Sequence, residues 1–188
     1  MSHQRRNMKT HKLCLSLLAM LVVGLLVGCS TSTKSPDVSD SIRKSLDQAG
    51  FKDVTVSQDR DKGIVTLGGH VAAEADKVQA ESLATALAAG QVVANQIAVT
   101  PLGVESEAKT VNSDLDAGIE KNLDAALITH RLHKDVKFDV KNGVVTLTGE
   151  VNSQAQRARA EKVASSVLNV KQVVNELEIK NPKATSSK

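Results

Sequence analysis

An internal repeat constrains the fold of this 188-residue chain more than any other feature of its sequence. Residues 63–71 read Gly-Ile-Val-Thr-Leu-Gly-Gly-His-Val, and residues 143–151 read Gly-Val-Val-Thr-Leu-Thr-Gly-Glu-Val. The offset of 80 residues, from 63 to 143, then holds without a gap to the end of each copy, where Asn95 corresponds to Asn175. A solenoid needs about three repeats or more to bury a continuous core. Two copies therefore predict two tandem domains.

Each copy is predicted to begin with a helix, because apolar side chains recur at every third or fourth position. The recurring residues are Val38, Ile42, Leu46 and Ala49 in the first copy and Leu115, Ile119, Leu123 and Leu127 in the second. Ser35 before Pro36 is typical of a helix start. Ser113, with Asp116 three residues later, is typical too, since the serine oxygen can accept a hydrogen bond from a free backbone amide.

A β-hairpin is predicted after the first helix. In the second copy, residues 136–140 alternate between apolar and polar side chains, as in a strand with one buried face. Asn142 and Gly143 then supply the positive φ angles of a two-residue turn. In the first copy the corresponding loop covers residues 58–62 and is longer, so we expect a looser turn there.

The second helix of the second copy is predicted to open at Ser153, with Gln156 in the reciprocal capping position. It runs to about Leu168. The first copy has Ala73 in place of the capping serine. We therefore expect the second helix of the first copy to fray more than its counterpart.

A last strand, at residues 93–99 or 173–179, completes an α-β-β-α-β unit in each copy. Two of the three strands are joined by a hairpin and the third by a helical crossover, so each sheet must be mixed. Two helices covering one face of the sheet would bury each small core. The predicted fold class is α+β, with two tandem α-β-β-α-β domains, each a three-stranded mixed sheet packed against two helices.

Three features of the second copy resemble one known family. They are the motif at 143–151, a helix with regularly spaced alanines, and Val-Lys-Gln-Val-Val-Asn-Glu-Leu at 170–177. They resemble the BON domain, which occurs in osmotically inducible periplasmic proteins and in dual-domain outer-membrane lipoproteins. The resemblance is weaker in the first copy, which has Gly90 and Ala94 where the second has valines. It implies a non-enzymatic envelope module associated with phospholipid or membrane maintenance.

The domain boundaries follow from the repeat and from breaks in the apolar pattern. The two BON-like domains are expected at 37–100 and 111–180. Residues 101–110 are expected to be a linker, because Pro and Gly interrupt the preceding strand and the charged stretch that follows has no core pattern. Residues 181–188 are polar and are expected to form a disordered tail.

The amino-terminal residues predict a lipoprotein signal peptide, residues 1–28. Residues 1–12 carry four basic side chains and no acid, and an apolar run over 13–27 follows, too short to span about 30 Å of hydrocarbon comfortably. Leu-Val-Gly-Cys at 26–29 resembles a lipobox. We expect cleavage before Cys29, which would carry diacylglycerol, and a tether over 29–36. Whether Cys29 would also carry an N-linked acyl chain is left open.

Two alternatives stay open at the amino terminus. The segment could instead be an ordinary signal peptide or a short membrane helix with an incidental cysteine. Met8 could be the true start in place of Met1, since the residues that follow it already supply a basic region. Neither choice of start changes the prediction for Cys29.

Processing removes the apparent basicity of the chain. Of 24 basic residues four lie in the signal peptide, which leaves 20 basic against 21 acidic, a net charge of −1. The sequence has no Trp or Tyr and two Phe. Nucleic-acid binding normally needs a basic stripe and stacking aromatics, so we expect no nucleic-acid partner. Cys14 leaves with the signal peptide, so we expect no disulfide.

Candidate chemistry is sparse, and we expect no catalytic residues, metal, free cofactor or small-molecule substrate. His130 and His133 could share a metal if the first helix continued to Leu132, but no third ligand completes a site; a surface pair is the alternative. Residues 59–63 resemble a calcium loop, but the glycine comes one place early and the bidentate acid is missing. We interpret this loop as a solvated turn.

One basic group merits testing as a contact for anionic phospholipid or for a partner protein. It comprises Arg157, Arg159, Lys162 and Lys171. The alternative is a solvated face, because positions 157 and 159 lie about 200° apart on a helix. The second copy is neutral, with 10 basic and 10 acidic residues, whereas the first has 6 against 9.

Two functions compete. The first is a lipid-anchored lipoprotein that contacts phospholipid and supports outer-membrane integrity or osmotic stress tolerance. The second is a periplasmic scaffold that docks on an envelope assembly. The expected location is the periplasmic face of the outer membrane, because Ser30 rather than Asp follows the cysteine, by analogy with lipoprotein sorting in enteric-type bacteria.

Overall fold

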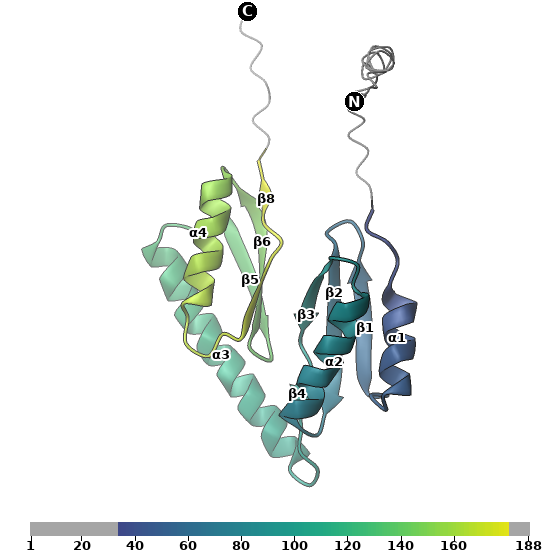
Figure 1. Cartoon of the computed structure of the whole chain (residues 1–188). Coiled ribbons are helices and arrows are strands. Elements are labelled where there is room, and N and C mark those ends of the chain that lie inside the picture. Colours follow the sequence, from purple (N-terminus) through teal and green to yellow (C-terminus); the bar gives the residue numbers. More distant parts are fainter. Residues whose placement is uncertain (1–33, 181–188) are drawn as a thin grey trace, which may run out of the picture. The chain divides into compact units, whose positions relative to one another are not determined.

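The structure is a computed structural model that describes residues 34–180 (Figure 1). The expected signal peptide, the lipidation residue Cys29, the tether before Lys34 and the tail over 181–188 lie outside the described residues. Residues 34–180 form two successive α-β-β-α-β-β units (Figure 1), each with a four-stranded sheet instead of the predicted three strands, because the expected last strand is split in two. The α+β fold class and the tandem organisation predicted from the repeat are therefore confirmed.

The elements follow the predicted order in both copies. The first copy contains α1 (Ser39–Gln48), β1 (Val54–Asp59), β2 (Ile64–Val71), α2 (Glu74–Leu87), β3 (Val92–Asn95) and β4 (Ala98–Val99). The second copy contains α3 (Glu105–Thr129), β5 (Val136–Lys141), β6 (Val144–Val151), α4 (Gln154–Ser165), β7 (Gln172–Asn175) and β8 (Glu178–Ile179).

Both sheets are mixed, as the connections require. In the first copy β1 pairs with β2 antiparallel and β3 pairs with β2 parallel, in the order β1-β2-β3. The second copy repeats this order as β5-β6-β7. The expected last strand is interrupted at Gln96 and Ile97, so that its end, β4, pairs separately with the far end of β2. The Ile97 side chain is fully buried at this break.

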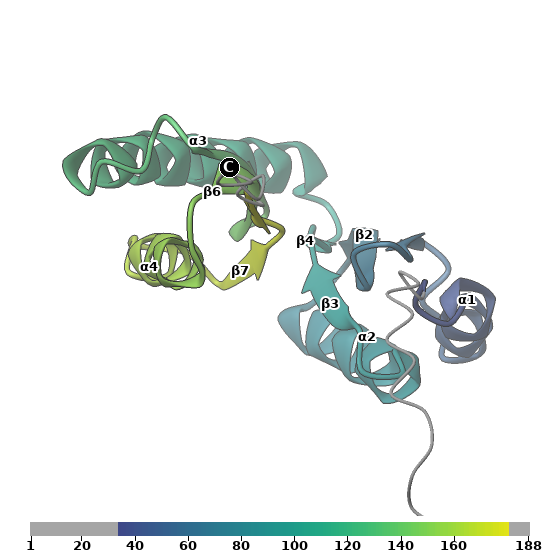
Figure 2. The same cartoon turned by 90° about the horizontal axis from the view of Figure 1, so that it is seen from above.

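The core of each copy lies between its sheet and its two helices, which cover the same face of the sheet (Figure 2). In the first copy Leu46 of α1 and Leu67 of β2 are fully buried, and Ala80 and Ala84 of α2 pack against them. Alanines at these positions let the helix backbone approach the sheet closely. The second copy uses the equivalent set, which includes Leu127, Leu147, Ala160 and Ala164.

Both predicted starts of the first helices are wrong. In the first copy α1 begins after Val38, with no side-chain cap, and Ser35 instead donates its backbone N–H to the Arg60 carbonyl oxygen at 2.9 Å. In the second copy α3 begins at Glu105, not near Ser113. Residues 105–110, expected within the linker, are therefore helical. Glu, Ala and Lys favour helix, and two acids in the first turn interact well with the helix dipole.

Two residues of the predicted first-helix stripes lie outside the cores. Ala49 is exposed beyond the end of α1. Leu115 is 45% exposed, because α3 is 25 residues long and only its second half packs on the sheet, through Ile119, Leu123 and Leu127. The apolar spacing identified the helices correctly but could not show where packing stops.

The predicted turn and N-cap were confirmed, but the reciprocal half of the cap was not, because Gln156 Oε1 accepts from the Asn152 N–H at 3.0 Å instead of from Ser153. Asn142 and Gly143 adopt φ angles of 51° and 81° at the β5–β6 turn. The Ser153 hydroxyl accepts from the Gln156 N–H at 3.2 Å at the start of α4, whereas Ala73 leaves α2 without a side-chain cap. Within residues 34–180, no helix combines the length and apolar character that crossing a bilayer requires.

Candidate functional site

The four basic residues that the sequence singles out are not gathered into one cluster. Arg157 is partly buried, and its Nη2 donates to the Asn175 carbonyl oxygen at 2.9 Å. Its Nε is buried without a hydrogen-bond partner among the described residues. Arg157 therefore ties α4 to the end of β7. Arg159 is exposed on another side of α4, as the helical spacing predicts.

Arg159 belongs to a basic surface at the end of α3, which we call the α3-end surface. It lines a shallow hollow with His130 and Arg131, which follow the last turn of α3. His133 and Lys134 continue this segment and are exposed. This surface could not be predicted from the sequence, because Arg159 comes from α4 and meets the loop only after folding.

Asp135, the acid that follows the α3-end surface in sequence, is held within its own domain. Lys180 Nζ donates to Oδ1 at 3.2 Å, and Gln156 Nε2 donates to Oδ2 at 3.2 Å. These hydrogen bonds, the one from Lys180 most strongly, lower the pKa of Asp135. The carboxylate therefore stays ionised and paired with Lys180.

Lys162, three residues after Arg159 and about 60° round the helix from it, lines a second open hollow together with Lys171, Glu161 and Ser165. Both lysines are exposed. The structure thus divides the four predicted residues into Arg157, Arg159 and the Lys162–Lys171 pair.

The second helices of the two copies differ in charge although they occupy equivalent places. α4 carries three basic residues and one acid, a net charge of +2. α2 carries one basic residue and three acids, a net charge of −2. Arg159 and Lys162 of α4 correspond to the neutral Gln79 and Ser82 of α2. Only the second copy therefore presents a positive helix surface.

Equivalent asparagines fasten α2 and α4 to their sheets. Asn95 Nδ2 donates to Glu81 Oε2 at 2.9 Å and to the Lys77 carbonyl oxygen at 3.4 Å, and its Oδ1 accepts from the Ile97 N–H at 3.3 Å. Asn175 forms the corresponding bonds, with 2.9 Å to Glu161. In each copy one asparagine side chain forms hydrogen bonds both to the second helix and to the backbone at the break in the last strand. The same interaction therefore stabilises this break in both copies.

The two copies also contact each other, and all described residues fall in one compact unit. A small buried cluster joins the two sheets, and its members are Ile64, Ala94, Val144 and Val174. Gln172 Nε2 donates to the Val93 carbonyl oxygen at 2.7 Å, and its Oε1 accepts from the Asn95 N–H at 3.0 Å. The amide of Gln172 therefore takes the place of a backbone peptide at the edge of β3. Lys62 of the first copy and Glu176 of the second also form an ion pair.

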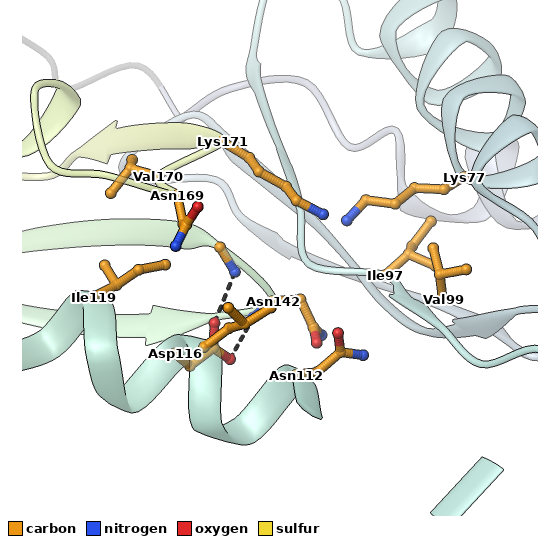
Figure 3. Close-up of a pocket in the computed structure, with 12 residues that line it drawn as sticks. Lys77, Ile97, Val99, Asn112, Asp116, Ile119, Asn142, Asn169, Val170 and Lys171 are labelled. Atoms are coloured by element: carbon orange, nitrogen blue, oxygen red, sulfur yellow. Dashed lines mark hydrogen bonds between the residues drawn. The ribbon is translucent and has the colours of Figure 1, made fainter. Parts of the chain in front are cut away.

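A cavity of about 330 Å³ lies between the copies (Figure 3). Lys77 from α2 and Lys171, before β7, extend into it from opposite sides (Figure 3). Lys77 was not predicted as a site residue. It lies three residues before Ala80 and seven before Ala84, and this spacing already indicates a place on the buried stripe of α2.

A family model for the BON domain matches residues 35–101 and 115–181, which together make up more than half of the chain. The chain belongs to the BON-domain family. The second match begins ten residues after the start of α3, from Glu105 to Leu115. The exposed first part of α3 is therefore an addition to the second BON domain, and the two BON domains include both asparagine anchors and both lysines of the cavity.

Two relatives are similar in sequence. Osmotically-inducible protein Y of Escherichia coli (strain K12) is 30% identical over 137 residues, which are 72% of this chain and 67% of the relative. An uncharacterized protein in the gshII 5′ region of Anaplasma centrale is 36% identical over 70 residues, which are 37% of this chain and 46% of the relative. The second match therefore spans less than half of that relative's length.

Solved structures of CdsD, a structural protein of the type III secretion system of Chlamydia trachomatis, show a weak likeness. One has a TM-score of 0.36 and 14% identity, and covers 77% of this chain and 92% of that chain. The other, a C-terminal domain, has a TM-score of 0.32 and 15% identity, and covers 80% of this chain and all of that chain. Likenesses this weak carry no inference about fold or function.

Neither of the two sequence patterns considered for metal binding is arranged as a metal site in the described residues. α3 ends at Thr129, so His130 and His133 do not share a helical turn. Asp59 Oδ1 accepts from the backbone N–H groups of Asp61 and Lys62, at 3.0 and 3.1 Å, which makes the loop a closed turn. Residues 34–180 contain no group of three or more His, Cys, Asp or Glu side chains arranged to hold a metal ion.

Proposed function

We propose that this BON-domain protein is a lipoprotein anchored through Cys29, and that its second BON domain contacts anionic phospholipid at the periplasmic face of the outer membrane. In this role it would support membrane integrity or osmotic stress tolerance. The lipobox at 26–29 supports the anchor. The name of the Escherichia coli relative, an osmotically inducible protein, supports the stress role.

The observation that carries the lipid contact is the charge difference between α4 and α2. Arg159 and Lys162 are exposed on α4, and neither forms an ion pair within residues 34–180. Each basic residue near an anionic membrane surface contributes about 1 kcal/mol. The first BON domain, with a net charge of −3 and an acidic α2, lacks this attraction. The second BON domain is therefore the one proposed to face lipid.

The anchor makes a weak contact sufficient. The seven residues from Ser30 to Pro36 span at most about 25 Å when extended. Tethering at this distance raises the effective concentration of headgroups around the domains, so that even a weak contact is largely occupied. The contact is proposed to be electrostatic and superficial, because Trp and Tyr, which usually settle at the membrane interface, are absent from the sequence.

Vesicle co-sedimentation tests this proposal on the region from Ser30 onward, which contains the compact unit. We expect binding to phosphatidylglycerol vesicles at low salt and much weaker binding at about 150 mM salt, where screening is stronger. The double variant Arg159→Gln, Lys162→Gln should lose about thirtyfold in affinity, since two contacts of about 1 kcal/mol are removed.

A matched control uses two exposed lysines of the first BON domain, Lys44 and Lys52. Replacing both by Gln removes the same charge and should leave vesicle binding unchanged. Equal losses in the two double variants would show that only net charge matters. Absence of binding at low salt would refute the lipid contact.

The scaffold function is favoured by a different surface, at the first part of α3. Four apolar side chains are exposed there, and they are Leu102, Val104, Val111 and Leu115, at 86, 47, 56 and 45%. Residues 104–116 carry one basic residue and four acids, so this surface suits a protein better than an anionic membrane. Photo-crosslinking from position 111 in cells tests it, and a crosslinked protein that persists after Leu115→Gln would contradict the assignment.

A further inference from the structure

Lys77 of α2 is buried along most of its length, with 6% of the residue exposed, and its ammonium end lines the cavity between the BON domains. The ammonium nitrogen is not among the buried unpartnered atoms of the described residues. No hydrogen bond or ion pair of its ammonium group is found within residues 34–180. Burial of the side chain, followed by the positive charge of Lys171, lowers the pKa of Lys77.

Lys171 faces Lys77 across the cavity between the BON domains. Its backbone N–H donates to the Gly143 carbonyl oxygen at 2.9 Å. A Cβ on residue 143 would lie 3.0 Å from Cγ of Lys171, so the lysine stem packs directly over Gly143. Figure 3 shows the two ammonium groups pointing toward each other. Two positive charges thus converge from different domains.

None of the acids near Lys77 forms an ion pair with it in the described residues. Asp116 accepts from the backbone N–H groups of Asn142 and Gly143, at 2.7 and 2.8 Å, one on each carboxylate oxygen (Figure 3). Glu81 accepts from Asn95 Nδ2 at 2.9 Å. Glu74, in the first turn of α2, is exposed. The charged side chains that line the cavity are Lys77, Lys171 and Asp116, which together carry a net charge of +1.

The rest of the cavity wall combines amides with apolar side chains. Asn112 and Asn169 place side-chain amides at its edge (Figure 3). Ile97, Val99 and Ile119 form an apolar wall. Such a wall suits the organic part of a ligand, while the lysines and amides suit an anionic group.

We propose that this cavity is a binding site for a phosphate group, held by the ammonium groups of Lys77 and Lys171. A phosphate ester carries a charge of about −1 to −2 and several acceptor oxygens, which matches two convergent lysines. Lysine binds phosphate as a point charge and needs no planar alignment. The source can be a free phosphate compound or a lipid headgroup. The site does not depend on the contact proposed for Arg159 and Lys162, which do not line the cavity.

The test uses the full chain in a non-ionic detergent, with ¹³C-labelled lysines observed by NMR during titration with inorganic phosphate. We expect saturable shifts of the Lys77 and Lys171 signals, and we expect bound phosphate to raise the pKa of Lys77. Lys77→Met and Lys171→Met keep the side-chain length and remove the charge. Each should weaken phosphate binding by about tenfold or more. Lys121→Met, at an exposed position of α3 outside the cavity, should leave it unchanged.

Circular dichroism and thermal unfolding of each variant separate binding from folding. Lys77→Met should keep or raise the unfolding temperature, because it removes a partly desolvated charge that is repelled by Lys171. If Lys77→Met fails to fold, the Lys171→Met variant and the Lys77 pKa of the unaltered protein still decide the question. Phosphate affinity that is equal in all variants, or no saturable response of the lysine signals, would overturn the proposal.

Two further additions identify the source of the phosphate. Short-chain phosphatidylglycerol that displaces inorganic phosphate, where short-chain phosphatidylcholine does not, would support a lipid headgroup. Displacement by glycerol phosphate alone would support a free phosphate ester. The Arg159→Gln, Lys162→Gln variant should retain its phosphate affinity, so failure of the phospholipid contact and failure of this site give different results.

Discussion

Replacing Gly69 by alanine tests how the bend in the central strand of the first BON domain is maintained. Gly69 lies in β2 with a φ angle of +82°, in the left-handed region. A Cβ at this position would overlap the carbonyl oxygen of Asp53, which also accepts from the His70 N–H at 3.3 Å. Alanine therefore fits only if the start of β1 moves away from β2. Gly149 meets the same obstacle at Asp135 in the second BON domain.

Three alanine substitutions separate the contributions to the cost. A left-handed φ costs a non-glycine residue about 1–2 kcal/mol, and displacing packed backbone costs about 1–3 kcal/mol more. Loss of the His70 hydrogen bond adds about 1 kcal/mol, so Gly69→Ala should cost about 3 kcal/mol or more. Gly50 has a φ of +91° but open space around it, so Gly50→Ala should cost only the first term. Gly118, inside α3 with open space, should become about 0.5–1 kcal/mol more stable as alanine.

Urea unfolding of the region from Ser30 onward, followed by circular dichroism, measures the three free energies. Gly50 and Gly69 lie in the same BON domain. The difference between the losses of unfolding free energy in Gly69→Ala and Gly50→Ala therefore reports the steric contact and its hydrogen bond alone. A change in the slope with urea would show that the two domains unfold separately, and each transition would then be fitted by itself. If Gly69→Ala costs no more than Gly50→Ala, the steric argument is refuted.

Two other predictions follow from the caps and from Lys77. Ser153→Ala should cost about 1 kcal/mol by removing the N-cap of α4. Ala73→Ser, at an extended backbone position equivalent to Ser153, should stabilise α2 by a similar amount. Shifts of the unfolding temperature in the same direction in both variants would contradict this. The lowered pKa of Lys77 means that the folded chain binds fewer protons than the unfolded chain just below pH 10.5. Stability should therefore rise with pH in that interval, and urea unfolding of Lys77→Met should show a smaller rise.

Several features of this protein could be predicted because their causes are local. The Asn142–Gly143 turn depends on two residues that tolerate positive φ, and the cap at Ser153 depends on a hydroxyl three residues before its donor. The repeat itself is an arithmetic property of the sequence, and it correctly predicted two mixed sheets. The start of α3 at Glu105 was mispredicted, because Ser113 offered a plausible cap but the residues before it also favour helix.

The candidate sites depended on contacts between distant segments. Arg159 joins Arg131 and His130 only because α4 packs beside the end of α3. Lys77 and Lys171 are in different repeats, and they converge only because the helix-free faces of the sheets meet at a small apolar cluster that includes Ile64 and Val144. Periodicity reports which side of an element is buried. It carries no information about which partner covers it.

The amino-acid sequence by itself determined the two copies, the order of their elements and the turns and caps that depend on neighbouring residues. The tertiary structure decided the burial of Lys77, the division of the basic residues of α4 and the docking of the Gln172 amide on the edge of β3. The physical reason is that backbone angles and helical spacing are set within a few residues. Burial and charge partnership arise only when segments far apart in the chain are packed together.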